Sequence, residues 1–218
     1  VLLAGHCDEI GFIITRIDEK GFIYFNPVGG ISHKVAPGLR VEILGESNCI
    51  TGVIGVNAEH HGGLKEKFEF DDLFIDCGFK DKKQAEKLVR TGDYAVYSSE
   101  ITELHNGLIA SKALDDKTGS FIVAEVIRKL KGQKLNVGVY SVSTTSEEIG
   151  LQGAYFAAAG IEPDLAIVCD VTWATDYPAV NRSKYGDYGV DGGPVLAVGS
   201  PVSAKINKML RDAAKTKK

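Results

Sequence analysis

The sequence lacks the features of several broad classes of protein. No apolar run approaches the roughly 18 residues that a helix needs to cross a bilayer, so we expect no membrane segment. The chain has no excess of positive charge: it contains 25 Lys and Arg residues and 29 Asp and Glu residues, which give a formal net charge of −4. This balance argues against nucleic acid as a partner. The chain opens with VLLAGHCDEI, a buried-strand pattern, so we also expect no signal peptide.

Paired cysteine motifs are lacking as well. The four cysteines form neither a C-x-x-C pair nor the spacing of a zinc finger. We interpret them as reduced thiols of a cytoplasmic protein, while several disulfide pairings remain alternatives. An initial Met is also absent and the chain begins within an apparent strand, so we expect a piece of a longer protein. The cysteines are Cys7, Cys49, Cys77 and Cys169.

What the chain does contain falls into two patterns. Apolar residues make up 44% and charged residues 25%, a balance typical of globular domains. Residues 11–102 hold short apolar runs broken by Gly, Pro, Asn and Asp, which predict several short strands in a small barrel or sandwich. One helix is expected in this stretch, at DKKQAEKLVRT. The expected strands are GFIITRI, GFIYFNPV, RVEIL, ITGVIGV and GDYAVYS.

From about residue 103 the pattern changes to strands that alternate with helices. Strands are expected at LNVGVYSVS and DLAIVCDVT, and helices at DDKTGSFIVAEVIRKL, after Glu148 and at SAKINKMLRDAAKTKK. This alternation predicts an α/β fold with a mostly parallel sheet and helices on both faces. The continuously apolar opening strand VLLAG belongs to the same sheet. We therefore predict an α/β domain of residues 1–10 and 103–218, with a barrel-like β domain of residues 11–102 inserted.

Polar side chains lie where the predicted strands end and where the long helix begins. In an open parallel sheet these positions meet in one crevice beyond the carboxyl ends of the strands. Five or more carboxylates and one imidazole cannot gather there unpaired, because repulsion and desolvation would be severe, so we expect a shared cation. The residues are His6, Asp8, Asp115, Asp116, Glu147, Glu148 and Asp170.

Members of this set also have purely structural alternatives. Asp115 and Asp116 could cap the helix that follows them, and the adjacent Glu147 and Glu148 could favour the start of the next helix. A lone histidine is more often a fold residue than a ligand. Here, however, Asp8 lies two residues after the histidine and could orient a ligating imidazole through its second nitrogen. The joint occurrence of four acidic clusters favours a metal site.

The donor types in this set indicate which ions would bind. Carboxylates and imidazole without a thiolate suit Zn²⁺, Co²⁺ or Mn²⁺ rather than a cysteine-bound structural zinc. One carboxylate with two oxygens can bridge a pair of metals about 3.5–4 Å apart. A glutamate that is not used for coordination is then free to move a proton.

Four motifs, in chain order, resemble those of the glutamyl-aminopeptidase/tetrahedral-aminopeptidase family of dinuclear metallopeptidases: HCDEIGF, KALDDKTG, TTSEEIGLQGA and CDVTWATDYP. The resemblance extends through NPVGGISHKVAPGLRVEI and GGPVLAVGSP, so it covers essentially the whole chain. It implies an α/β catalytic domain with an inserted barrel-like domain, and two divalent metal ions. It also implies a peptide substrate and a homo-oligomer, which is a dodecamer in many relatives.

The resemblance further implies a role for each site residue. Glu147 would be the general base of a metal-dependent aminopeptidase, in which an activated water attacks the first peptide carbonyl of the substrate. The implied set is His6 and Asp170 as terminal metal ligands, Asp115 as the bridging ligand, Glu148 as a further ligand, Glu147 as the base and Asp8 in a supporting position beside the ligands.

One departure from the family pattern concerns histidine. The family completes its second metal site with a histidine near the C-terminus, and this chain has none after Asp115. We expect that both ends of the catalytic domain are missing and that this piece by itself is inactive. A fold role is expected for His33, His60 and His61 in the β-rich region, while His105 could approach the site.

Two other functions remain open from the sequence. Paired carboxylates also serve glycoside hydrolases such as endoglucanases, although these rarely need a His-x-Asp and three further acidic clusters. A peptidase-like scaffold that lacks one metal ligand could instead serve as an assembly or peptide-binding subunit. Sensitivity to chelators separates the first alternative from a metallopeptidase, and the number of bound metals per chain separates the second.

Overall fold

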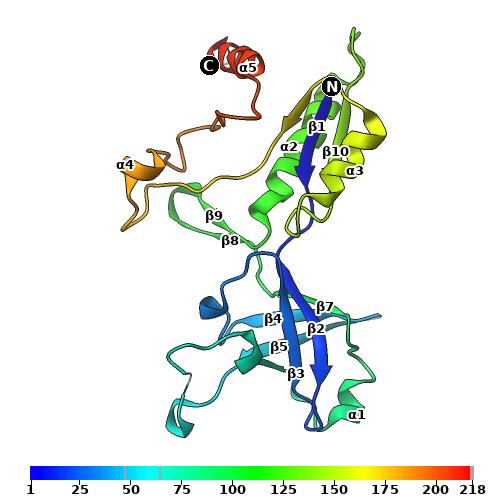
Figure 1. The fold of residues 1–218 in the computed structure, drawn as a ribbon, viewed down its shortest axis with the longest axis vertical. Helices are drawn as coiled ribbons and strands as arrows, with labels where there is room; N and C mark the ends of the chain where they lie inside the picture. Colours follow the sequence, from blue (N-terminus) through cyan, green and yellow to red (C-terminus); the bar gives the residue numbers. More distant parts are fainter. Residues whose placement is uncertain (47, 64, 217–218) are drawn as a thin grey trace. The chain divides into compact units, whose positions relative to one another are not determined.

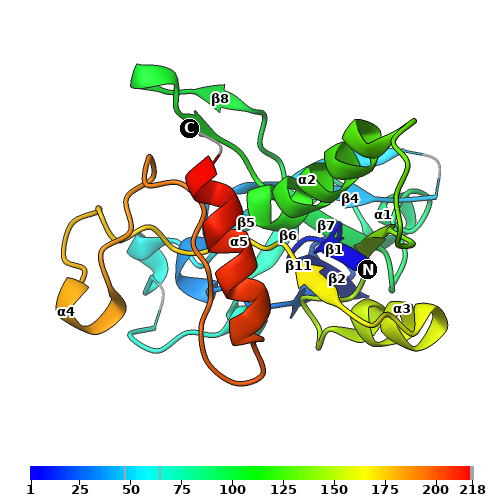
Figure 2. The ribbon, with the colours of Figure 1, turned by 90° about the horizontal axis from the view of Figure 1, so that it is seen from above.

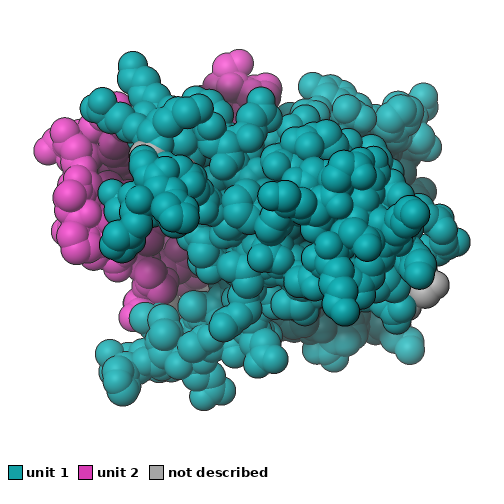
Figure 3. Space-filling view, turned by 90° about the horizontal axis from the view of Figure 1, so that it is seen from below, with its two compact units in different colours: residues 1–171 teal, residues 172–218 magenta. Residues whose placement is uncertain are grey.

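A computed structural model describes residues 1–46, 48–63 and 65–216. The chain divides into two compact units, Val1–Val171 and Thr172–Lys218, which Figure 3 shows in separate colours. The first unit contains a parallel sheet and a closed barrel, so the chain is an α/β protein with a six-stranded barrel. The barrel predicted from the short strands is therefore confirmed.

The parallel sheet has the strand order β10-β1-β11 within the described residues. The central strand β1 (Leu2–His6) pairs in parallel with β10 (Tyr140–Thr144) and with β11 (Ala166–Val168). Figure 2 shows β1 and β11 next to each other. All five residues of β1 are buried, which agrees with its unbroken apolar run. His6, the last residue of β1, therefore lies at the end of the central strand of the sheet.

Two helices contact this sheet. α2 (Leu114–Leu130) packs against β1 and β10, and α3 (Gln152–Ile161) contacts the same two strands. Both helices agree with the sequence prediction. Among the apolar residues of α2, Val123 is buried, whereas Ile122 and Ile127 are 45% and 37% exposed. The apolar face of α2 is thus only partly covered in this chain.

The barrel closes through strands in the order β2-β3-β6-β5-β4-β7, and every neighbouring pair is antiparallel. Figure 1 labels five of these strands, β2, β3, β4, β5 and β7. Its interior is the main hydrophobic core of the described chain, with Phe12, Ile43 and Ile75 fully buried. The strands are β2 (Gly11–Ile17), β3 (Ile23–Val28), β4 (Arg40–Leu44), β5 (Cys49–Gly55), β6 (Phe74–Asp76) and β7 (Tyr94–Tyr97).

Several short elements differ from the sequence predictions. The helix expected at DKKQAEKLVRT is limited to α1 (Lys82–Ala85). β6 was not predicted, and neither was the ribbon of β8 (Thr102–Glu103) with β9 (Ile109–Ala110). Strands of two or three residues contain about one period of alternation, which is too little to identify them unless they lie in a longer apolar run, as β11 does. Single 3-10 turns lie at His33–Val35, Glu59–His61, Phe70–Asp72 and His105–Gly107.

The second unit contains α4 (Arg182–Tyr185) and α5 (Ala204–Thr216). α5 agrees with the amphipathic helix predicted at the end of the chain, except that residues 217 and 218 lie outside the described residues. Ile206 is half-buried and Met209 is 58% exposed, so this helix too is only partly covered. Across the described ranges, no helix has both the length and the apolar character that a bilayer crossing requires.

Candidate metal centre

The imidazole of His6, the last residue of β1, lies at the centre of the candidate site. Its side chain is 3% exposed and its strand is paired on both sides, so the ring is held firmly. The ring Nε2 lies 3.0 Å from Asp115 Oδ1 and 3.7 Å from Glu147 Oε2. Side chains from three distant parts of the sequence therefore meet at one imidazole.

Asp8 joins the end of β1 to the glutamate pair. Its main-chain oxygen lies 3.2 Å from His6 Nδ1, and its Oδ1 lies 3.4 Å from the same nitrogen. The Asp8 carboxylate also accepts hydrogen bonds from the main-chain N–H of Glu147, at 3.2 Å, and of Glu148, at 3.3 Å. The contacts of Asp8 thus join the ring of His6 to the segment that bears both glutamates.

Asp116 forms a second connection, between β1 and α2. Its side chain has no exposed surface and accepts hydrogen bonds from the main-chain N–H of His6, at 3.1 Å, and of Gly119, at 2.8 Å. The bond from Gly119 caps the first turn of the helix, as the structural alternative for this residue predicts. The bond from His6 was missed, because nothing in the motif LDDKTG tells which of its two aspartates faces the sheet.

Two glycines leave room for the start of α2, Gly5 on the side of β1 and Gly119 on the side of Cys169, which follows β11. A Cβ on Gly5 would lie 2.5 Å from Ser120 N, and a Cβ on Gly119 would lie 2.6 Å from Cys169 O and would also meet the Asp116 carboxylate. Ser120 Oγ in turn donates to the His6 carbonyl oxygen at 2.9 Å. The start of α2 is therefore pinned against the end of β1.

Two overlapping groups of side chains within the described ranges could each hold a metal ion. The ligand atoms of each group lie within 4.8 Å of one another. Imidazole nitrogen and carboxylate oxygen suit Zn²⁺, Co²⁺ and Mn²⁺, so the donor set fits the ions that the sequence predicts. The groups are His6 with Glu147 and Asp170, and His6 with Asp115 and Glu148. Every predicted ligand belongs to one of them, and so does Glu147, the predicted base.

The crowding of acidic groups alters their protonation. Burial raises the pKa of Glu147, and the negative charges of Asp170 and Asp115 add to the rise. Burial likewise raises the pKa of Glu148, with Asp115 contributing next. Burial on its own would lower the pKa of His6, but Glu147 and Asp115 outweigh it and the pKa is raised. Carboxylates that hinder one another's ionisation in this way create a place where a cation is stabilised.

The barrel also reaches the site, through the loop that follows β3. Gly29 has a φ of 83°, and a Cβ on it would lie 2.7 Å from Ile10 Cγ2 and 3.2 Å from Glu148 Cβ. The motif NPVGG predicts a turn at this point. Its contact with a glutamate more than a hundred positions later has no sequence signal, and we identify it only from the structure.

The remaining histidines lie outside both groups. His33 packs edge-on against Phe68 with ring centroids 5.0 Å apart, which agrees with a fold role. His105 lies in a 3-10 turn, and among the described residues neither it nor His60 or His61 joins a group able to hold a metal. The expectation that His105 could approach the site is not supported.

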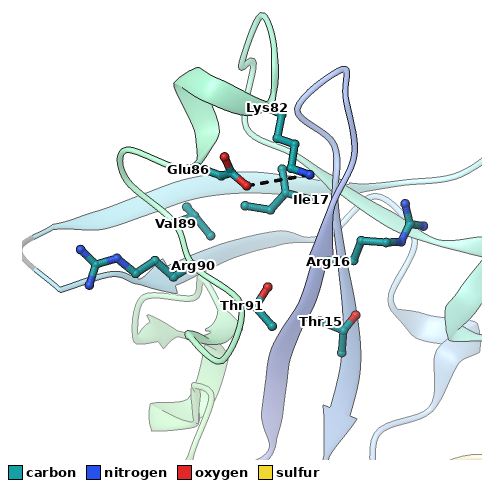
Figure 4. A pocket seen from close by; sticks show the side chains of 8 residues that line it. All are labelled: Thr15, Arg16, Ile17, Lys82, Glu86, Val89, Arg90 and Thr91. Atoms are coloured by element: carbon teal, nitrogen blue, oxygen red, sulfur yellow. Dashed lines mark ion pairs between the residues drawn. The ribbon is translucent and has the colours of Figure 1, made fainter.

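A hollow on the barrel offers no comparable chemistry (Figure 4). Lys82 lies 3.9 Å from Glu86, and Arg90 lies 2.7 Å from Glu46. The guanidinium of Arg16 stacks over a neighbouring tyrosine ring, 3.5 Å from its centroid. Because these cations already have partners in the barrel, we assign the hollow no ligand. It is lined by Thr15, Arg16, Ile17, Lys82, Glu86, Val89, Arg90 and Thr91.

Comparison with known proteins gives consistent matches. The model of a family described as M42 glutamyl aminopeptidase matches residues 1–218. A relative from Acetivibrio thermocellus with an aminopeptidase name is 35% identical over 219 residues, which are 99% of this chain and 63% of that protein. The structure of aminopeptidase APDkam598 from Desulfurococcus kamchatkensis is 35% identical, with a TM-score of 0.90 over 99% of this chain and 61% of that chain.

A third match is the TET1 peptidase of Pyrococcus horikoshii, which is described as able to assemble into a tetrahedron or a large octahedral shell. It is 32% identical, with a TM-score of 0.73 over 83% of this chain and 56% of that chain. The chain therefore spans between 56% and 63% of the length of these three proteins.

Proposed function

The chain belongs to the M42 glutamyl aminopeptidase family, and from this premise we propose that the whole protein is a metal-dependent aminopeptidase that removes N-terminal residues from peptides. One observation carries the proposal. His6 Nε2 lies 3.0 Å from Asp115 Oδ1, and the two groups that share this histidine keep their ligand atoms within 4.8 Å. Divalent ions are what best stabilises so many oxygens around one imidazole.

We infer two divalent ions, with Zn²⁺ and Co²⁺ ahead of Mn²⁺. The residues that would hold them are His6, Asp115, Glu148 and Asp170. Ions of this kind, when bound, lower the pKa of a water molecule and polarise the substrate carbonyl. The support for this set is the mixture of imidazole and carboxylate donors in the two groups.

Glu147 is the residue that we propose as general base. Its side chain is 27% exposed, so water can reach it, and burial raises its pKa. A raised pKa suits a carboxylate that accepts a proton and returns it near neutral pH. The Asp8 carboxylate accepts a hydrogen bond from the main-chain N–H of Glu147 at 3.2 Å, which restrains the position of Glu147. Glu147 would take the proton of the attacking water and deliver it to the leaving amine.

Two isosteric variants of the full-length protein test this division of roles. Glu147→Gln should keep its metal ions and lose turnover by a factor of about 10²–10⁴, the usual contribution of a general base. Glu148→Gln should lose bound metal, because it removes a ligand charge. Metal content by mass spectrometry and hydrolysis of an N-terminal aminoacyl substrate provide the two measurements. Preserved turnover in Glu147→Gln, or metal loss as large as in Glu148→Gln, would remove Glu147 from this role.

The organisation of the whole protein is also part of the proposal. We infer a catalytic domain from residues 1–10 and 103–218, with a mostly parallel sheet and helices on both faces, and residues 11–102 as the inserted domain. In support, the closed barrel lies in the chain between β1 and β10, which pair with each other. A homo-oligomer such as a dodecamer is proposed by analogy with the shell-forming TET1 peptidase. Four free thiols support a cytoplasmic location.

The two alternatives have less support. A glycoside hydrolase is not favoured, because the family whose model spans the chain is one of peptidases. The metal-poor scaffold is suggested by the number of histidines, because His6 is the one imidazole in the two groups of described residues that could hold a metal. Two bound metals per chain of the full-length protein would support the enzyme, and none or one would support the scaffold.

A further inference from the structure

Glu9 directly follows Asp8 and binds two lysines at once. Its Oε1 accepts hydrogen bonds from Lys112 Nζ and Lys117 Nζ, each at 3.0 Å, and its Oε2 accepts from Lys112 Nζ at 3.0 Å. The side chains of Glu9 and Lys112 are 20% and 28% exposed. A shared contact that is partly shielded from water is screened less than a single exposed ion pair.

The two lysines lie on either side of Asp115 in the sequence. Lys112 precedes Asp115 by three positions and Lys117 follows it by two. Glu9, for its part, follows His6 by three positions. The contact therefore ties the segment that carries the imidazole to the segment that carries the carboxylate facing it.

The position of Asp115 is less constrained by its surroundings than that of His6. His6 is buried in a paired strand, whereas the side chain of Asp115 is 57% exposed. The backbone of Asp115 is also not helical, with φ −83° and ψ 110°, although it lies within the bounds of α2. Regular helix bonding therefore does not hold it in place. Two contacts hold this segment. The buried Asp116 carboxylate accepts the main-chain N–H of His6, and at the more exposed surface Lys117 donates to Glu9.

We propose that Glu9 is a positioning residue of the metal centre: by holding Lys112 and Lys117 it keeps Asp115 opposite His6. The inference rests on the proposed metal-dependent function. It assigns to Glu9 no contact with the metal or the substrate.

The main test is Glu9→Gln, which removes the charge and keeps the size of the side chain. Calorimetric titration with Zn²⁺ alone should show affinity reduced about tenfold or more, as for other residues that support metal ligands. The visible spectrum of the Co²⁺-loaded protein should shift as well, because the ligand geometry changes. The matched control is Glu19→Gln, which removes a 90% exposed carboxylate paired with Lys82 in the barrel at 3.5 Å. This control should leave both measurements unchanged.

A second set of variants tests whether Glu9 acts through the lysines. The double variant Lys112→Met/Lys117→Met should weaken Zn²⁺ binding as Glu9→Gln does, and adding Glu9→Gln to it should cause no further loss. Losses that simply add, or a Glu9→Gln protein with wild-type affinity and spectrum, would overturn the inference and leave the proposed function standing. A wild-type protein that binds neither ion would overturn both.

Discussion

At the scale of single residues, neighbouring carboxylates of the site have different partners. Asp115 presents Oδ1 to the imidazole of His6, while Asp116 beside it is buried and accepts two main-chain N–H groups. Asp8 and Glu9 form a similar pair, since one binds amides of the glutamate segment and the other binds lysines. The donors that each carboxylate meets, and not its residue type, decide what it does.

Glu9 supplies a prediction about stability and pH. Burial alone would raise its pKa, but the hydrogen bonds from Lys112 and Lys117 lower it further than burial raises it, and the pKa is below its usual value. The folded protein therefore favours the charged form. This stabilisation is complete above the ordinary glutamate pKa of about 4.3 and is lost as the pH falls through the lower pKa of the folded state.

We accordingly expect Glu9→Gln to reduce the free energy of unfolding by about 1 kcal/mol at pH 7, since the pair is partly exposed. The difference from wild type should shrink as the pH is lowered from about 5 to 3. Urea denaturation in the presence of a chelator measures this without a contribution from metal binding. A difference that stays constant across that range would contradict the assigned ion pairs.

At the scale of elements, the site depends on the close contact of β1 with the start of α2. A Cβ on Gly119 would lie 2.6 Å from Cys169 O and would meet the Asp116 carboxylate that binds β1. Gly119→Ala should therefore destabilise the protein by about 1–3 kcal/mol through overpacking. Gly160→Ala is the matched control, because Gly160 lies in α3 and a Cβ on it would meet nothing within 4 Å. That change should be neutral or stabilising, since Ala favours helix. Equal effects of the two substitutions in urea denaturation would refute the packing argument.

The elements also show what the sequence can and cannot predict. β1 carries an unbroken apolar run, α2 and the barrel strands β2 to β5 carry repeated apolar positions, and the structure has all of them. β6 pairs over at most three residues with strands that are distant in sequence, and the β8–β9 ribbon pairs over two residues only, so neither has a local apolar pattern long enough to predict it.

The candidate site divides in the same way. His6 and Asp170 can be identified because each follows an apolar strand. Other features result from tertiary packing, and no local pattern encodes them. They are the burial of Asp116 against His6, the approach of Gly29 to Glu148 and the lysine contacts of Glu9.

At the scale of the whole molecule, the metal centre should contribute to global stability. A ligand that binds only the folded state adds stability in proportion to the logarithm of its concentration, about 2.7 kcal/mol at 100 times its dissociation constant. Zn²⁺ or Co²⁺ should therefore raise the melting temperature and a chelator should lower it. The matched variant His6→Ala removes the imidazole common to both groups and should abolish the response. An unchanged melting temperature for wild type with either ion would contradict the proposed centre.

The distances along the chain between the partners of His6 have a consequence for synthesis. The imidazole meets Asp115 across 109 positions, and Asp8 meets the amides of Glu147 and Glu148 across 139 and 140. A ribosome therefore completes every strand of the barrel before it makes Asp115, Glu147 or Glu148. Until Asp170 has emerged, the growing polypeptide displays a histidine without its full set of acidic neighbours, so the proposed centre could not be filled before that point of synthesis.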